Sequence, residues 1–305
     1  MKNLFVIIVC ILPLLAGCSA SKSEGVQKHL LWKVSDSNSS IYILGSVHLA
    51  DSSIYPLDTV IEETFNRSAE LAVEIDMSDP SILQEIAVQT AGLGMLPDSM
   101  SLEKMLPDSL NNAIDSLCLL WGLPLNTFSR YKPWAATMTL LSLAIMRMGY
   151  DSDLGVDYHF LRRAHHTGKK IVSLETVEEQ VWALTGEGVS DSLGIFYLKT
   201  SIQEMAELEA YVEKLMDAWK SGDDSLLAVA MEMESKEGNA ADSSLQKQIT
   251  DNIYTERNHR MAERLTAFLA EDRKIFVVVG AAHLAGKDDN VLDLLRRRGF
   301  TVEQL

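Results

Sequence analysis

Two histidines occur in the same local setting near the two ends of this 305-residue chain. His48 ends the string Gly-Ser-Val-His at residues 45–48, and His283 ends Gly-Ala-Ala-His at residues 280–283. An apolar, β-rich run precedes each glycine. A strand followed by such a turn presents an imidazole at the carboxyl end of the strand, where open α/β sheets bind ligands. The repeat predicts a single site built from two halves of one fold.

A carboxylate completes the set. Residues 71–76 alternate as a strand, with Leu71, Val73 and Ile75 on one face and Glu74 on the other. Two neutral imidazoles and a carboxylate form a three-ligand set for a divalent metal that keeps one position open for water. The same trio could act without metal, with one histidine as general base. Asp76 is a rival to Glu74 on the same face.

Two other charged residues are candidates for the site. Glu175 directly follows a predicted strand at residues 170–174, although a charge at the start of the next helix is the simpler explanation. Arg257 lies on the predicted helix before the last strand pair, next to Asn258. It could bind a substrate carboxylate or stabilise an oxyanion, or it could belong to a solvated helix face. We place Arg257 with the catalytic residues and leave Glu175 open.

Several function classes are disfavoured by the rest of the sequence. There is no His-Glu-x-x-His helix, Gly-x-Ser-x-Gly elbow or phosphate-binding glycine loop with lysine. The formal charge is −16, and it moves to −17 if Lys2 is lost with a leader. Nucleic acids and anionic lipids require a basic face, so we expect no nucleic-acid partner.

The N-terminus has the features of a lipoprotein leader. Lys2 precedes an apolar stretch at residues 4–15 that is too short to span a bilayer, and the stretch ends in Leu-Ala-Gly-Cys. We predict a signal peptide over residues 1–17, lipidation of Cys18 and a tether over residues 18–29. The expected location is the cell envelope, with the lipid anchor in the outer membrane if the cell is Gram-negative.

The remaining residues, 30–305, are expected to form a single α/β domain. A hairpin at residues 30–34 and 41–44 and a strand at 71–76 open the chain, and strands at 275–279 and 301–305 close it. The long middle part is mostly helical by its three- and four-residue spacing. The fold class is therefore a mixed central sheet flanked by helices, with two pseudo-repeated strand–Gly-x-x-His halves and a helical insertion. The expected helices cover residues 58–66, 81–89, 109–121, 133–148, 156–166, 177–184, 191–234 with a break at 221–223, 244–269 and 290–298.

The chain resembles the TraB/PrgY/GumN family, to which the animal Tiki metalloproteases are related. The resemblance runs from about residue 30 to residue 305 and rests on short strings that occur in the family's order. These strings are Leu-Trp-Lys-Val (31–34), Ile-Leu-Gly-Ser-Val-His (43–48), Leu-Ala-Val-Glu-Ile-Asp (71–76), Lys-Pro-Trp (132–134), Gly-Val-Asp (155–157), Leu-Glu-Thr-Val-Glu-Glu-Gln (174–180), Arg-Asn (257–258) and Val-Val-Gly-Ala-Ala-His-Leu (278–284).

The resemblance implies a metal-dependent hydrolase. In its protease branch the two Gly-x-x-His histidines and a glutamate are essential, and these correspond to His48, His283 and Glu74. The implied cofactor is a divalent ion such as manganese or cobalt, with zinc as a further candidate. The implied substrate is a peptide, or another small molecule, outside the cytoplasm.

Two alternatives remain open at this point. The wider group includes ChaN-type haem-binding lipoproteins, which suggests a non-catalytic haem or peptide binder. For that reading Met95, Met100, Met105, Tyr131 and Trp134 could line an apolar cleft, although methionines at helical spacing also fill cores. The related erythromycin esterases suggest instead a metal-free hydrolase that uses the same three residues.

Overall fold

A computed structural model describes residues 28–185, 191–231, 244–245, 247–248, 250–286 and 289–305. The expected signal peptide, Cys18 and nearly all of the tether lie outside these residues. In the part of the chain that is described, no helix is both long and apolar enough to cross a membrane.

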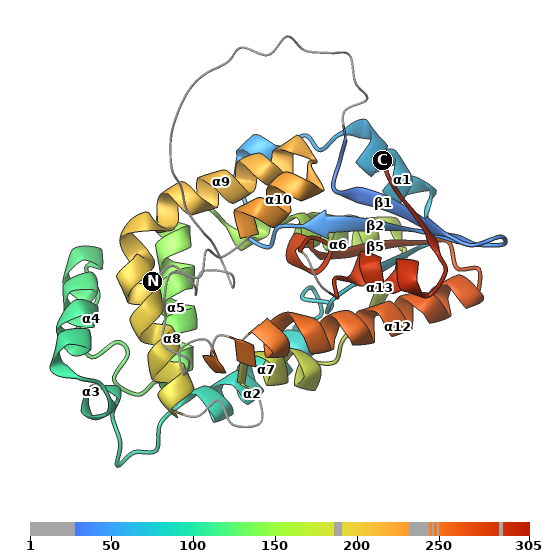
Figure 1. The fold of residues 1–305 in the computed structure, drawn as a ribbon. Coiled ribbons are helices and arrows are strands. Elements are labelled where there is room, and N and C mark those ends of the chain that lie inside the picture. The colour runs from blue at the N-terminus through green and yellow to red at the C-terminus, as the bar shows by residue number, and fades with distance from the viewer. Residues whose placement is uncertain (1–27, 186–190, 232–243, 246, 249, 287–288) are drawn as a thin grey trace, which may run out of the picture.

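A six-stranded mixed sheet forms the centre of the molecule, and this confirms the expected α/β class (Figure 1). The order is β4-β3-β5-β2-β1-β6. The inner strands β3, β5 and β2 and the edge strand β4 run parallel, whereas β1 is antiparallel to both of its neighbours. The bounds are β1 Leu31–Ser35, β2 Ser40–Ser46, β3 Glu70–Val73, β4 Lys170–Ser173, β5 Ile275–Gly280 and β6 Thr301–Gln304.

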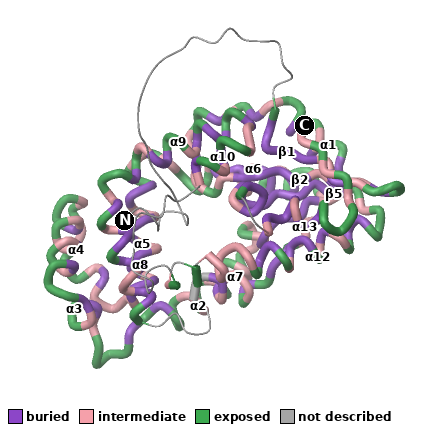
Figure 2. The backbone as a smooth tube through the Cα atoms, in the orientation of Figure 1, coloured by how far each residue is buried: buried purple, intermediate pink, exposed green. Residues whose placement is uncertain are grey.

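The two strands that carry the Gly-x-x-His strings are direct neighbours. In the parallel register of β2 and β5, Gly45 lies opposite Val279 and Ser46 opposite Gly280. The two turns therefore leave the same edge of the sheet side by side, one residue out of step. Figure 2 shows how strongly this central part of the sheet is buried.

Helices cover both faces of the sheet. On one face, α1 (Thr59–Arg67) and α6 (Val156–Thr167) pack through Phe65, Phe160 and Phe276, whose ring centroids lie 4.9, 5.1 and 5.7 Å apart. On the other face lie α12 (Glu256–Ala270) and α13 (Val291–Arg297) (Figure 1). Burying aromatic rings of this size contributes much of the core's apolar stabilisation.

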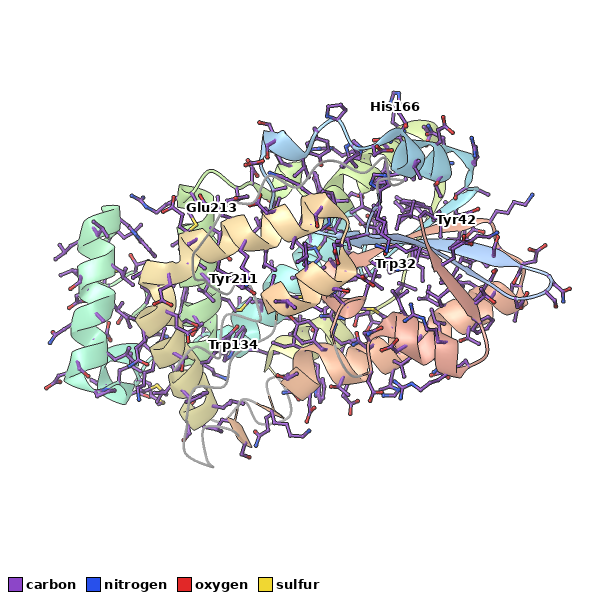
Figure 3. All side chains as sticks on the ribbon, turned by 45° about the horizontal axis from the view of Figure 1, so that its top comes forward. Trp32, Tyr42, Trp134, His166, Tyr211 and Glu213 are labelled. Atoms are coloured by element: carbon purple, nitrogen blue, oxygen red, sulfur yellow. The ribbon has the colours of Figure 1, made fainter. Side chains whose placement is uncertain are left out.

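The helical part at the far end of the molecule comes from two separate segments of the chain. The connection from β3 to β4 supplies α3 (Leu102–Met105), α4 (Asp108–Trp121) and α5 (Pro133–Arg147), and the connection from β4 to β5 supplies α8 (Asp191–Glu204). Helices α5 and α8 pack closely, and a second apolar core forms around Leu140, Leu198 and Cys118. Trp134 belongs to this end and Trp32 to the sheet (Figure 3). The expected insertion is thus built from two crossovers.

Three expected elements differ from the structure. The helix expected from residue 191 to the break at 221–223 is interrupted by the 3₁₀ turn η4 (Met205–Glu207), which separates α8 from α9 (Leu208–Ser221). The strand expected at residues 71–76 ends at Val73, and Leu71, Ala72 and Val73 are all buried, because β3 is an inner parallel strand covered on both faces. The helix expected over 244–269 contains a π-helical turn, η5 (Asp251–Thr255), directly before α12. The remaining bounds are η2 Ser52–Ile54, α2 Pro80–Gly94, η3 Ser152–Leu154, α7 Val177–Thr185, α10 Asp224–Met231 and η6 Ala281–His283.

Candidate functional site

His48 stands just beyond β2, and Asp157 of α6 holds its ring. The Nδ1 of His48 lies 2.9 Å from Asp157 Oδ2, and Ser46 Oγ donates to Asp157 Oδ1 at 2.6 Å. The His48 side chain is 62% exposed. The Asp157 carboxylate raises the pKa of His48 to about 9. The carboxylate therefore favours the protonated form of the His48 ring.

The start of α6 is joined to the backbone of the His48 turn. Val156 donates its N–H to the Val47 carbonyl at 3.0 Å, and Ala50 pairs with Asp151 in an isolated β-bridge. Residue 155 must be glycine, because a Cβ there would overlap the carbonyl oxygen of His48. This close approach places Asp157 in the first turn of α6, where a helix stabilises a carboxylate.

His283 is held by a different kind of partner and is buried. It ends the short 3₁₀ turn η6, its side chain is 4% exposed, and its Nδ1 lies 2.6 Å from Asn258 Oδ1. Asn258 Nδ2 donates to the Asp289 carbonyl, which fixes Oδ1 as the acceptor for the ring. Nδ1 therefore carries the proton and Nε2 a lone pair. Burial and the Arg257 charge lower the pKa of His283 to about 3.

Glu74 lies between the two turns as a buried, fully ionised carboxylate. Its Oε1 accepts the N–H of Gly280 at 2.6 Å, and its Oε2 accepts from Arg257 Nη2 at 2.6 Å and from Gln180 Nε2 at 3.3 Å. Burial alone would raise the pKa of Glu74, but Arg257, followed by the two histidines, keeps it well below the usual range. Such a carboxylate is a weak general base and a good anionic ligand.

Arg257 joins Glu74 to Glu175. Its Nε and Nη2 donate to the two oxygens of Glu175 at 2.8 and 2.6 Å, and Nη1 donates to the Ile253 carbonyl at 3.3 Å. The Glu175 side chain is fully buried, so it is the partner of this guanidinium and its role as a helix-terminal charge is secondary. Arg257 is not part of a solvated helix face. Its contacts go to carboxylates of the site, which favours a positioning role over oxyanion stabilisation.

Gly280 is the point at which the three candidate ligands meet. A Cβ at this position would lie 3.2 Å from both His48 Nε2 and Glu74 Oε1 and 3.6 Å from His283 Cδ2. A larger residue would therefore enter the space that the three side chains share. The structure brings together the residues of the predicted metal set around a gap that only glycine leaves open.

The donor set fits a divalent metal by its chemistry. Each histidine has its Nδ1 held by an oxygen atom, and this is the arrangement that orients ligating histidines in metalloproteins. His283 Nε2 and Glu74 Oε1 are 3.8 Å apart, too far for a hydrogen bond, yet two ligand bonds of about 2.0–2.2 Å can span that distance. Within the described residues, no three His, Cys, Asp or Glu side chains are already close enough together to hold an ion. The three side chains would have to move closer together to hold an ion.

The structure adds residues that the sequence patterns did not single out as functional. Asp157 contacts His48 and Gln180 contacts Glu74, while the ring of Tyr254 packs on His283 with centroids 5.5 Å apart. The glycine and the first-turn aspartate of the Gly-Val-Asp string were the available signal for Asp157. No sequence pattern around Tyr254 indicated that it lies at the site, because its orientation depends on the π-helical turn η5.

Other candidates do not join the site. Asp76 accepts the N–H of Ser78 in a local turn instead of facing the histidines. Met95 and Met100 are exposed, whereas Met105 and Tyr131 pack against the second core. Met95 and Tyr131 nevertheless face each other in an isolated β-bridge, and a Cβ on Gly94, next to Met95, would touch the Trp134 ring.

Curated relatives extend over nearly the whole chain. An uncharacterized protein of Treponema pallidum (strain Nichols) is 21% identical over 303 residues, which cover 96% of this chain and 90% of that protein. The uncharacterized protein YbaP of Escherichia coli (strain K12) and its counterpart in Shigella flexneri are each 21% identical over 272 residues, covering 88% of this chain and 94% of each relative. No solved structure gives a significant match.

The family assignment follows from a match of the same extent. The family model described as the TraB/PrgY/gumN family matches residues 30–304, which include both Gly-x-x-His turns, Glu74, Asp157, Glu175 and Arg257. The chain belongs to the TraB/PrgY/gumN family.

Proposed function

We propose that this protein is a metal-dependent hydrolase, most simply a peptidase, anchored to a membrane by lipid. The observation that carries the proposal is the arrangement around Gly280. The Nδ1 atoms of both histidines are held by oxygen acceptors, and the two rings and the Glu74 carboxylate surround the space next to Gly280. Membership of the family is consistent with this, since the Tiki-like proteases depend on the corresponding residues.

Each residue of the site would have a separate role in hydrolysis. His48, His283 and Glu74 would hold the ion, which when bound supplies a water of lowered pKa. Arg257 and Glu175 keep Glu74 ionised and fixed in place. The exposed ring of His48 marks the open side from which a substrate can approach, while His283 and Glu74 form the closed floor. A site with one open and one closed side can bind a peptide bond while limiting access of bulk water.

Metal analysis of the purified full chain in detergent tests the proposal directly. We expect one equivalent of Mn²⁺, Co²⁺ or Zn²⁺ per chain and peptide cleavage that stops on treatment with a chelator. His48→Ala and Glu74→Gln should each abolish both binding and cleavage. His165→Ala is the matched control, because His165 lies on α6 and contacts Ser78. Stoichiometric binding that survives the His48 and Glu74 substitutions would refute the assignment.

The His48–Asp157 pair also supports a second candidate, a metal-free hydrolase. A histidine bonded to a carboxylate is a general acid–base arrangement that works without a metal. This reading predicts hydrolysis that is unchanged by a chelator and lost in His48→Ala. Chelator-sensitive turnover that returns on adding one metal equivalent would exclude it.

The lipid anchor is proposed from the leader sequence and from the hydrogen bonds that fix the start of the folded domain. Gln304 Nε2 donates to the carbonyls of His29 and Gly222 at 2.9 and 2.7 Å, and His29 donates its N–H to the Leu305 carbonyl at 2.7 Å. A tether that starts here is held firmly at its folded end. We expect Cys18→Ala to move the protein from the membrane fraction to the soluble fraction, with Cys10→Ala as the control. Unchanged membrane association of Cys18→Ala would contradict the anchor.

A further inference from the structure

The His48 half of the site depends on an element outside both Gly-x-x-His turns. The segment from Asp151 to Asp157 includes η3 and the first turn of α6, and it lies against the His48 turn. Backbone bonds tie Ala50 to Asp151 and Val156 to Val47, and only a glycine at position 155 allows the approach. From this segment, the side chain of Asp157 bonds to His48.

The carboxylate of Asp157 is fixed at both oxygens. Oδ1 accepts the hydroxyl of Ser46 at 2.6 Å, and Oδ2 lies 2.9 Å from His48 Nδ1. Ser46 and His48 are two residues apart on the same chain segment, so one carboxylate bridges them. Because a carboxylate only accepts, Nδ1 of His48 must carry the proton, and Nε2 is left to face Gly280.

We infer that Asp157 is a positioning residue, which fixes the tautomer and direction of His48 toward the metal set, and that Ser46 in turn fixes Asp157. The inference rests on the proposed metal site for its functional consequence. The second histidine supports this inference. Asn258 holds the Nδ1 of His283 as Asp157 holds that of His48, and Asn258 is itself fixed by the Asp289 carbonyl. Outer-shell partners of ligating histidines commonly change metal affinity by about 10–100-fold when removed.

Two readouts on the full chain in detergent separate this role from general structural support. The first is the bonding state of the His48 ring, seen in nitrogen-15 NMR of histidine-labelled protein and assigned with His48→Gln. The second is the affinity for Co²⁺ alone, measured by titration. The variants are Asp157→Ala, Asp157→Asn and Ser46→Ala. The control is Asp153→Asn, an exposed aspartate of the same segment.

We expect Asp157→Ala to lose the bonded Nδ1–H signal of His48 and to bind Co²⁺ about 10–100-fold more weakly. Asp157→Asn and Ser46→Ala should give smaller losses, in that order, and Asp153→Asn none. An unchanged ring signal and unchanged affinity in Asp157→Ala would overturn the inference. If Asp157→Ala does not fold, the Asn and Ser46 variants decide, and wild-type affinity in both would overturn it.

The failure of the proposed function gives a different result. If the wild-type chain binds no Co²⁺, the metal site is wrong, whereas the NMR readout still decides whether Asp157 sets the His48 ring. Loss of the Nδ1–H signal in Asp157→Ala would then support the positioning role by itself. Retention of that signal would refute it.

Discussion

The two Gly-x-x-His turns share a spacing but hold their histidines in opposite surroundings. His48 is 62% exposed and bonded to an anion, Asp157, whereas the His283 side chain is 4% exposed and bonded to a neutral amide, Asn258. The pKa of His48 is raised to about 9 by that anion, and the pKa of His283 is lowered to about 3 by burial and the nearby Arg257. The repeated motif positions the rings, and the elements packed on each turn set the charge.

The two halves of the site are also stabilised by different interactions. The His283 half rests on a buried network of Glu74, Arg257 and Glu175. The His48 half rests on backbone bonds between two surface segments and a single carboxylate. We therefore expect damage to the buried half to unfold the protein, and damage to the exposed half to alter mainly its chemistry.

The largest effect is expected for Arg257→Met. The change leaves the buried carboxylates of Glu74 and Glu175 without their cation, and breaking one partner of a buried ion pair costs about 3–5 kcal/mol. Urea denaturation measures the loss. Arg264→Met on the same helix is the control, with about 1 kcal/mol or less expected because its ion pair with Glu179 is partly exposed. Equal losses in the two variants would show that the buried network is not special.

Substituting the two motif glycines should have different effects. Gly45→Ala should mainly lower stability, and Gly280→Ala should mainly weaken metal binding. In Gly45→Ala the new Cβ would lie 3.1 Å from Ala281 Cβ and 3.2 Å from Ala281 Cα, so it presses on backbone and should cost about 1–3 kcal/mol. In Gly280→Ala it would lie 3.2 Å from His48 Nε2 and Glu74 Oε1 instead. We expect that variant to lose metal binding by tenfold or more, with a smaller change in the free energy of unfolding. The reverse pattern would mean that Gly280 does not open the site.

The opposite pKa shifts predict a stability maximum near pH 6.5 for the metal-free protein. Below this pH the unfolded chain protonates His283 while the folded protein resists, so stability falls as the pH drops toward about 3. Above it, the folded protein keeps the proton of His48 that the unfolded chain loses, so stability falls as the pH rises toward about 9. Each titrating group changes the free energy of unfolding by at most about 1.4 kcal/mol per pH unit.

Variants of each half should flatten one arm of this pH profile. Thermal unfolding between pH 5 and pH 9 should show a weaker acid arm in His283→Asn and a weaker alkaline arm in His48→Asn. Part of the loss of stability at acid pH remains in His283→Asn, because burial also lowers the pKa of His159. If His283→Asn leaves the acid arm unchanged, the ring is protonated in the folded state and the contrast between the halves is wrong.

The smallest effect is expected for Trp219→Phe. The indole of Trp219, on α9, donates to the Gly45 carbonyl at 2.8 Å and so covers the first motif from outside the sheet. Removing this donor should cost about 1–2 kcal/mol while metal affinity changes less than twofold. A large loss of metal affinity would show that α9 helps to set the His48 turn, which would then depend on more than α6.

Most of the central sheet could be predicted from local sequence patterns. The strands of both motifs, the hairpin and the closing strand were expected within one or two residues of β2, β5, β1 and β6. The mixed sheet followed from these. The strand at residues 71–76 was wrong in length, because alternation suggested one solvent face where β3 is covered on both. Helix spacing also missed the π-helical turn, since one extra residue per turn leaves no clear trace in an apolar pattern.

The sequence by itself determined that two histidines follow strands and that Glu74 belongs to a strand segment, because β-rich runs and glycines act over a few residues. Only the tertiary structure decided which side chains orient them. Asp157 and His48 are 109 residues apart, and Arg257 and Glu175 are 82 apart. Such pairs form only when the crossovers bring α6 and α12 to one edge of the sheet. Whether each histidine is charged was decided in the same way, since charge depends on burial and neighbours that no local string contains.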